Sequence, residues 1–243
     1  MKKKTHFVGF FALFLCCGIL FSALLRTAEH GILTLLVTAE EPAQPVIILD
    51  AGHGGEDGGA TGKNGVLEKD LNLLLTSALA DLFRMAGYTV VETRTQDRLL
   101  CEADTPKGHR KQTDLEKRLE YAQKYPNACF ISIHMNTFPL PECQGTQVWY
   151  SQNDARSCAL AEEIQECVRA FVQPENHRRI KAATSSIYLL RHAKIPAVLV
   201  ECGFLSSPSE CALLCEEAYR QKLALCIFRG ICVNLESNPC ESA

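Results

Sequence analysis

Residues 46–59 have the sequence VIILDAGHGGEDGG, and this stretch decides the fold. Its first five residues form an unbroken apolar run of strand length, and a loop rich in glycine follows. Such runs are typical of strands that helices bury on both faces of a sheet. Because open α/β sheets place their sites beyond the carboxyl ends of the strands, we expect this loop to carry functional groups.

The rest of the chain alternates helical and strand patterns. Helices are predicted at 66–85, 113–124, 154–172 and 209–235, the last with a break near Glu217. Further strands are predicted at 88–93, 129–134, 145–150, 187–190 and 197–201, and a long polar loop at 99–112. This alternation predicts an α/β fold, with a twisted, mostly parallel sheet of about six strands and helices on both faces.

The first 40 residues have the composition of a targeting segment. Three lysines at positions 2–4 precede residues 7–25, an uncharged run long enough to span a bilayer. The lysines favour a cytoplasmic amino end, which would place the rest of the chain outside the cytoplasm. Residues 37–39 (VTA) resemble a signal-peptide cleavage site, so we expect 1–40 to be a membrane anchor or signal segment with a linker. Residues 45–236 are then expected to form one domain.

Charge and cysteine spacing exclude several classes of function. The formal net charge of −3 gives no electrostatic reason to expect nucleic acid as a partner. None of the 13 cysteines is spaced as C-x-x-C, so no zinc-ribbon or thioredoxin motif is present. The glycine-rich loop matches neither the G-x-G-x-x-G dinucleotide-binding motif nor the P-loop motif. Its acidic residues would also repel phosphate.

Polar side chains close three of the predicted strands, in stretches 50–59, 132–136 (SIHMN) and 200–204 (VECGF). The first two supply His53 and His134, and Glu68 begins the helix after the first loop. Two histidines and one glutamate, with a fourth position left open, are typical of catalytic zinc, which lowers the pKa of its bound water towards about 7. The sequence therefore predicts one Zn²⁺ per chain, bound by these three residues.

Glu201 is the remaining candidate, because a carboxylate at the end of an apolar strand is costly to bury without a task. Beside zinc-bound water it would act as general base and proton carrier. The alternative is a salt bridge at the strand end, for instance with Arg191. A structural zinc would instead need a fourth protein ligand, for which Cys202 is the nearest candidate.

Five stretches together resemble the zinc-dependent N-acetylmuramoyl-L-alanine amidases of the type-3 amidase family. They are VIILDAGHGGEDGGATGKNGVLEKDLNL (46–73), TRTQD (93–97), DLEKRLEYAQKYPNACFISIHMN (114–136), QGTQVWY (144–150) and IPAVLVECGFLSSPSE (195–210). The resemblance implies zinc ligands at His53, Glu68 and His134, a catalytic role for Glu201, and a twisted, mostly parallel sheet. It also implies cleavage of the amide between N-acetylmuramic acid and L-alanine of peptidoglycan.

Two departures from the family pattern, Ala51 for proline and Met135 for alanine, do not touch these residues. The short length, the apolar amino-terminal segment and the lack of a separate wall-binding domain resemble the sporulation-type member of the family. That subgroup acts on spore cortex peptidoglycan and prepares muramic-δ-lactam for germination. Asn136 and Arg191 are further candidates for holding the substrate or the developing oxyanion.

Two other functions stay open at this point. One is a zinc peptidase that cuts a bond within the stem peptide. The other is a non-catalytic, wall-binding module, which would lack a ligand or the glutamate. The sequence does not identify a protein partner.

Overall fold

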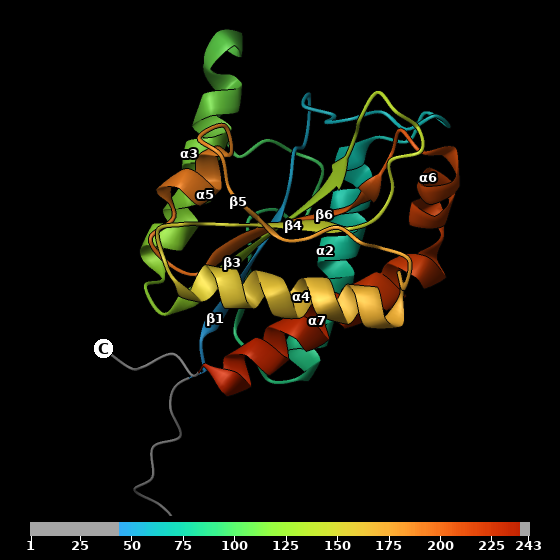
Figure 1. Ribbon diagram of the computed structural model, residues 1–243. Helices are drawn as coiled ribbons and strands as arrows, with labels where there is room; N and C mark the ends of the chain where they lie inside the picture. Colours follow the sequence, from blue (N-terminus) through green and yellow to red (C-terminus); the bar gives the residue numbers. More distant parts are fainter. Residues whose placement is uncertain (1–43, 239–243) are drawn as a thin grey trace, which may run out of the picture. The chain divides into compact units, whose positions relative to one another are not determined.

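A six-stranded sheet organises the part of the chain that the computed structural model describes, residues 44–238 (Figure 1). The spatial order of its strands is β2-β1-β3-β6-β4-β5. The strands are β1 (Val46–Ala51), β2 (Val90–Glu92), β3 (Ala128–Asn136), β4 (Gln147–Tyr150), β5 (Lys181–Ala182) and β6 (Ala197–Phe204). The strands β2, β1, β3 and β6 run parallel, whereas β4 is antiparallel to β6 and parallel to β5. The predicted mostly parallel sheet is therefore confirmed.

Helices cover both faces of this sheet, as predicted (Figure 1). They are α2 (Glu68–Met85), α3 (Arg110–Lys124), α4 (Arg156–Phe171), α5 (Tyr188–His192), α6 (Pro208–Cys215) and α7 (Glu217–Ser237), with a 3₁₀ turn η1 (Lys107–His109) before α3. One apolar core joins the sheet to α2, α4, α6 and α7, and the other joins it to α3 and α5. Alternate residues of the central strands supply the two cores, since successive side chains point to opposite faces.

No helix within residues 44–238 is long and apolar enough to cross a membrane. The predicted anchor or signal segment, residues 1–40, lies outside the described residues.

The prediction of a strand at 187–190 is wrong, because Ile187 precedes helix α5 and the other three residues lie within it. Both neighbouring positions of β6 are already occupied by β3 and β4, so the sheet has no place for another strand beside it. The apolar side chains Leu189 and Leu190 instead pack onto the sheet face. The strand that does extend the sheet is the two-residue β5, which is too short for its pattern to be recognised in the sequence.

Two helix boundaries also differ from the expectation. Helix α3 begins at Arg110 and follows η1 directly, so Thr113 does not cap it and the polar loop is shorter than predicted. The last helical stretch is broken at Glu216, whose extended backbone separates α6 from α7. This break lies one residue from its predicted place.

A buried ion pair closes the carboxyl end of β1. Asp50 is fully buried, and its Oδ1 accepts hydrogen bonds of 2.7 Å from Arg118 Nη1 and from Thr93 Oγ1. Its Oδ2 accepts a 2.6 Å bond from Ser132 Oγ. Burial alone would raise the pKa of Asp50, but the Arg118 guanidinium and the two hydroxyl groups hold that pKa below its usual value of 3.8. The carboxylate is therefore charged at neutral pH.

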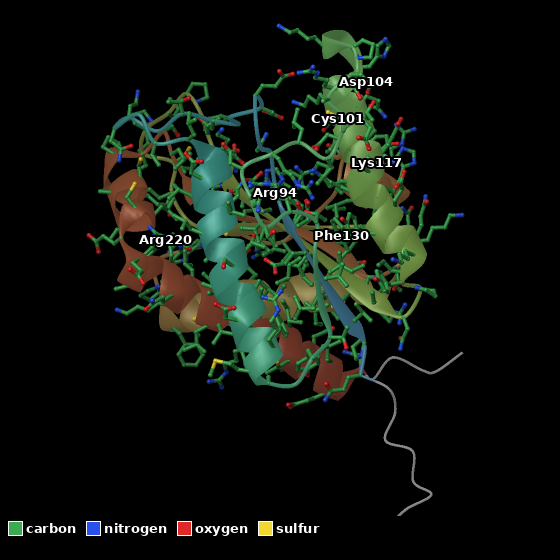
Figure 2. The ribbon with its side chains drawn as sticks, turned by 180° about the vertical axis from the view of Figure 1, so that it is seen from behind. Arg94, Cys101, Asp104, Lys117, Phe130 and Arg220 are labelled. Atoms are coloured by element: carbon green, nitrogen blue, oxygen red, sulfur yellow. The ribbon has the colours of Figure 1, made fainter. Side chains whose placement is uncertain are left out.

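The same arginine holds the loop that follows β1. Arg118 donates to the backbone oxygens of Ala51 at 2.6 Å and His53 at 2.7 Å, and Arg94 donates to those of Ala51 and Gly52 at 2.9 and 3.0 Å. Arg94 lies between α2 and α3 (Figure 2) and also bonds the carbonyl of Lys69. Two buried cations thus fix the backbone of residues 51–53.

Replacing Arg118 tests this arrangement. Arg118→Met should lower the free energy of unfolding by about 3–5 kcal/mol, because it leaves the Asp50 charge buried without its partner. Urea denaturation measures the change. Lys117→Met is the matched control, since Lys117 is the adjacent α3 residue (Figure 2) and, within residues 44–238, forms its ion pair with the exposed Glu120. Equal stability of the two variants would contradict the account.

Candidate metal centre

Three side chains that are distant in sequence meet beyond the carboxyl ends of β1 and β3. His53 follows β1, Glu68 is the first residue of α2, and His134 lies near the end of β3. One potential ligand atom from each lies within 4.8 Å of the other two. Glu68 Oε1 is 3.3 Å from His53 Nε2 and 2.9 Å from His134 Nδ1. The structure therefore brings together the predicted His, Glu and His set.

Two glycines make this close approach possible. A Cβ atom on Gly52 would lie 2.3 Å from the His134 ring, and one on Gly59 would lie 2.6 Å from Glu68 Oε2. His53 itself has a φ of 61°, which is the only positive φ of a non-glycine residue between 44 and 238. Such a backbone costs about 1–3 kcal/mol and persists only where the surroundings impose it. Here the buried arginines and the glycine contacts hold the histidine in place.

Glu68 is held as a carboxylate. Its Oε2 accepts a 2.8 Å bond from the amide of Ala60, and its Oε1 accepts a 3.1 Å bond from the amide of Met135. Burial opposes ionisation, but the hydrogen bonds from His134 and His53 bring the pKa of Glu68 well below its usual range. The side chain is thus a charged carboxylate that lies between two imidazoles and can serve as an oxygen ligand to a metal ion.

Asp57 is a site residue that the sequence analysis missed. Its Oδ2 lies 3.0 Å from His53 Nδ1, and its Oδ1 accepts a bond from the amide of Gly59. Burial would lower the pKa of His53, but the bonds to Asp57 and Glu68 raise it to about 9. Asp57 orients the ring so that Nε2 faces Glu68. The available signal was its place four residues after His53, in a loop of glycines that lets the chain fold back.

Glu201 lies beside this group. It is in register with His134 on the neighbouring strand β6, so both side chains point to the same face of the sheet. Its Oε2 is buried and has no hydrogen-bond partner among the described residues. Burial, together with the nearby charge of Glu68, raises the pKa of Glu201 to about 7. A buried carboxyl oxygen without a hydrogen-bond partner is costly in a protein. Its position next to the three potential metal ligands makes it a candidate for proton transfer.

The alternatives to these assignments lack support in the geometry. Arg191 is exposed on α5, and no ion pair joins it to Glu201 in residues 44–238. Cys202 follows Glu201 on β6 and therefore points to the opposite face, into the apolar core, so it does not join the three donors. Asn136, predicted to hold the substrate or the oxyanion, ends β3 after a shift of register, and its carbonyl accepts a bond from the amide of Leu205; the substrate roles of Asn136 and Arg191 stay predictions.

The model of the N-acetylmuramoyl-L-alanine amidase family matches residues 47–233. A germination-specific N-acetylmuramoyl-L-alanine amidase of Bacillus subtilis is 37% identical over 188 residues, which are 76% of this chain and 78% of the relative. The amidase LytC of the same organism is 30% identical over 76% of this chain, but only 34% of LytC is covered.

Solved structures show the same relationship. The CwlD amidase of Clostridioides difficile, determined in complex with the GerS lipoprotein, has a TM-score of 0.77 and 37% identity, and the match covers 80% of this chain and all of that one. An amidase from Clostridium difficile 630 has a TM-score of 0.70 and 29% identity, with 81% and 99% covered. These relatives are muramoyl amidases. Their similarity to this chain disfavours the two alternatives, a stem-peptide peptidase and a non-catalytic wall-binding module. The chain belongs to the N-acetylmuramoyl-L-alanine amidase family and is an enzyme that acts on peptidoglycan.

Proposed function

We propose that the amidase reaction of this chain depends on one Zn²⁺, held by His53 Nε2, Glu68 and His134 Nδ1. Two imidazoles and one carboxylate are donors that zinc prefers in catalytic sites, where a fourth position stays open. The buried and unpaired Oε2 of Glu201 next to the three donors is the observation that carries the proposal. Zinc bound here would polarise the scissile carbonyl and ease ionisation of the attacking water.

Glu201 then supplies the proton transfers. With a pKa of about 7 it can accept a proton from water and donate it again at neutral pH. Its Oε2 takes the proton from the attacking water and passes it to the nitrogen of the departing L-alanine. The amide C–N bond breaks, and the products are the lactyl carboxylate and a stem peptide with a free amino terminus. Asp57 keeps His53 in the orientation that presents Nε2.

The substrate that fits this chain best is spore cortex peptidoglycan, with muramic-δ-lactam as the later product. The similarity to a germination-specific amidase and to CwlD supports this choice. The apolar run 7–25 supports action outside the cytoplasm, with the segment serving either as membrane anchor or as signal peptide.

Deletion of the gene should yield spores whose cortex lacks muramic-δ-lactam, measured by muropeptide mass spectrometry. Normal lactam content in such spores would rule out the cortex role.

Substitution of Glu201 tests the proton transfer. Glu201→Gln should keep stoichiometric zinc but lose about 10²–10⁴-fold in kcat, since the amide cannot exchange the proton. Metal analysis and turnover of purified muropeptides are measured on the same preparation. Turnover at the wild-type rate would remove the assigned role, whereas loss of zinc would make Glu201 a ligand.

Substitution of Asp57 tests how His53 is oriented. Asp57→Asn should weaken zinc binding by about 10–100-fold, because outer partners fix the ring and the basicity of a histidine ligand. Competition with a chelator gives the affinity. Glu56→Gln is the matched control, since Glu56 lies in the same loop and pairs with Arg110 rather than with His53. If both variants bind zinc as the wild type does, Asp57 has no part in the centre.

A further inference from the structure

A row of side chains leads from the candidate metal centre along the sheet. His134 on β3 is in register with Glu201 on β6, and Glu201 is in register with Gln147 on β4. Residues in register on neighbouring strands point to the same face and are separated by about 4.8 Å. Gln147 therefore lies one strand beyond Glu201, on the side away from the three donors. Gln147 itself is buried, so a substrate can meet this end of the row only through the side chain that binds Gln147.

Arg178 is bound to the end of this row. Its Nη1 donates to Gln147 Oε1 at 3.3 Å, and its Nε donates to the carbonyl of Gln144 at 2.7 Å. Its guanidinium lies over the ring of Phe204, 4.4 Å from the centroid. The backbone amide of Arg178 is held by Asn176 Oδ1. The cation is thus fixed in one place by contacts to neutral groups.

No carboxylate forms an ion pair with Arg178 within residues 44–238. Its Nη2 donates no hydrogen bond to the described residues, although the side chain is half-buried. A fixed guanidinium with a spare nitrogen is suited to a carboxylate, which can accept from it. The arrangement resembles a prepared anion site more than a solvated surface charge.

The space beside Arg178 is large enough for part of a peptide. Arg178 lines a pocket of about 900 Å³. The rest of the lining comes from the 142–145 loop, the remainder of the 172–178 segment and residues of α6 and α7. Glu210 faces the same pocket, and its charge interacts with that of Arg178, but its carboxylate accepts bonds from the amides of Gly145 and Phe204 and forms no ion pair with the arginine. Glu142 and Glu175 are exposed at the pocket surface, where water screens their charges. Arg178 is therefore the half-buried cation of this pocket, and it suits an anionic ligand.

We propose that Arg178 binds the first free carboxylate of the stem peptide, carried by the residue that follows L-alanine, and thereby selects substrates with that charge. L-alanine and the residue that follows it together span up to about 7 Å when extended, which covers the step of about 4.8 Å from Glu201 towards Gln147. The proposal rests on the amidase reaction and adds a specificity-determining residue to it. It does not depend on the identity of the metal.

Two muropeptides that differ only in this carboxylate, free in one and amidated in the other, test the proposal. Wild-type enzyme should cleave the free form with a kcat/KM about 10–100-fold higher, as expected when a charged hydrogen bond is lost. Arg178→Gln should lose that preference, mainly through a raised KM for the free form, and should cleave the amidated form as the wild type does. Arg178→Lys should keep part of the preference, since the charge remains but the fork is lost.

Arg179→Gln is the matched control, because Arg179 is exposed and only its backbone carbonyl contacts Gln147. It should retain the wild-type preference. An equal loss of activity on both muropeptides would show that Arg178 merely supports the fold, and would overturn the proposal. If Arg178→Gln does not fold, the lack of any preference in wild-type enzyme overturns it as well. Continued cleavage of the amidated muropeptide would show that the amidase assignment holds even where the role of Arg178 fails.

Discussion

The buried pair of Asp50 and Arg118 is the interaction on which the rest of the site depends. It neutralises a charge at the carboxyl end of the central strand β1, where the chain must turn away from the sheet. The same guanidinium reaches the carbonyls of Ala51 and His53, so one residue of α3 connects the sheet, the helix and the loop. A loop so rich in glycine would otherwise have large conformational freedom. The ion pair converts it into a rigid support for a histidine.

Glu68 sets the second constraint. Its carboxylate is buried between two imidazoles and two backbone amides, which keeps it charged in a place where charges are costly. This negative charge draws cationic ligands. Burial, with a smaller contribution from the same charge, raises the pKa of Glu201 to about 7. One carboxylate therefore holds the centre together, and the other is kept ready to exchange a proton.

Much of this could be predicted from the sequence, because the decisive residues follow directly on strong local patterns. The apolar runs of β1, β3 and β6 located three strand ends, and the His, Glu and His set was predicted from them and is brought together in the structure. Helix α5 and strand β5 were not predictable, since their short patterns are decided by which edges of the sheet are already paired. Asp57 and Arg178 were missed for a related reason. Both were proposed here from contacts with His53 and Gln147, which sequence spacing does not reveal.

The most direct test of the account is X-ray absorption at the zinc edge on the full chain reconstituted with one equivalent of zinc. We expect only nitrogen and oxygen neighbours around the zinc, at about 2.0–2.2 Å, with the more distant scattering pattern of two imidazoles. His53→Ala and His134→Ala should each remove one imidazole from that pattern. A sulfur neighbour at about 2.3 Å would bring in a cysteine and contradict the account. So would a spectrum that neither histidine substitution changes.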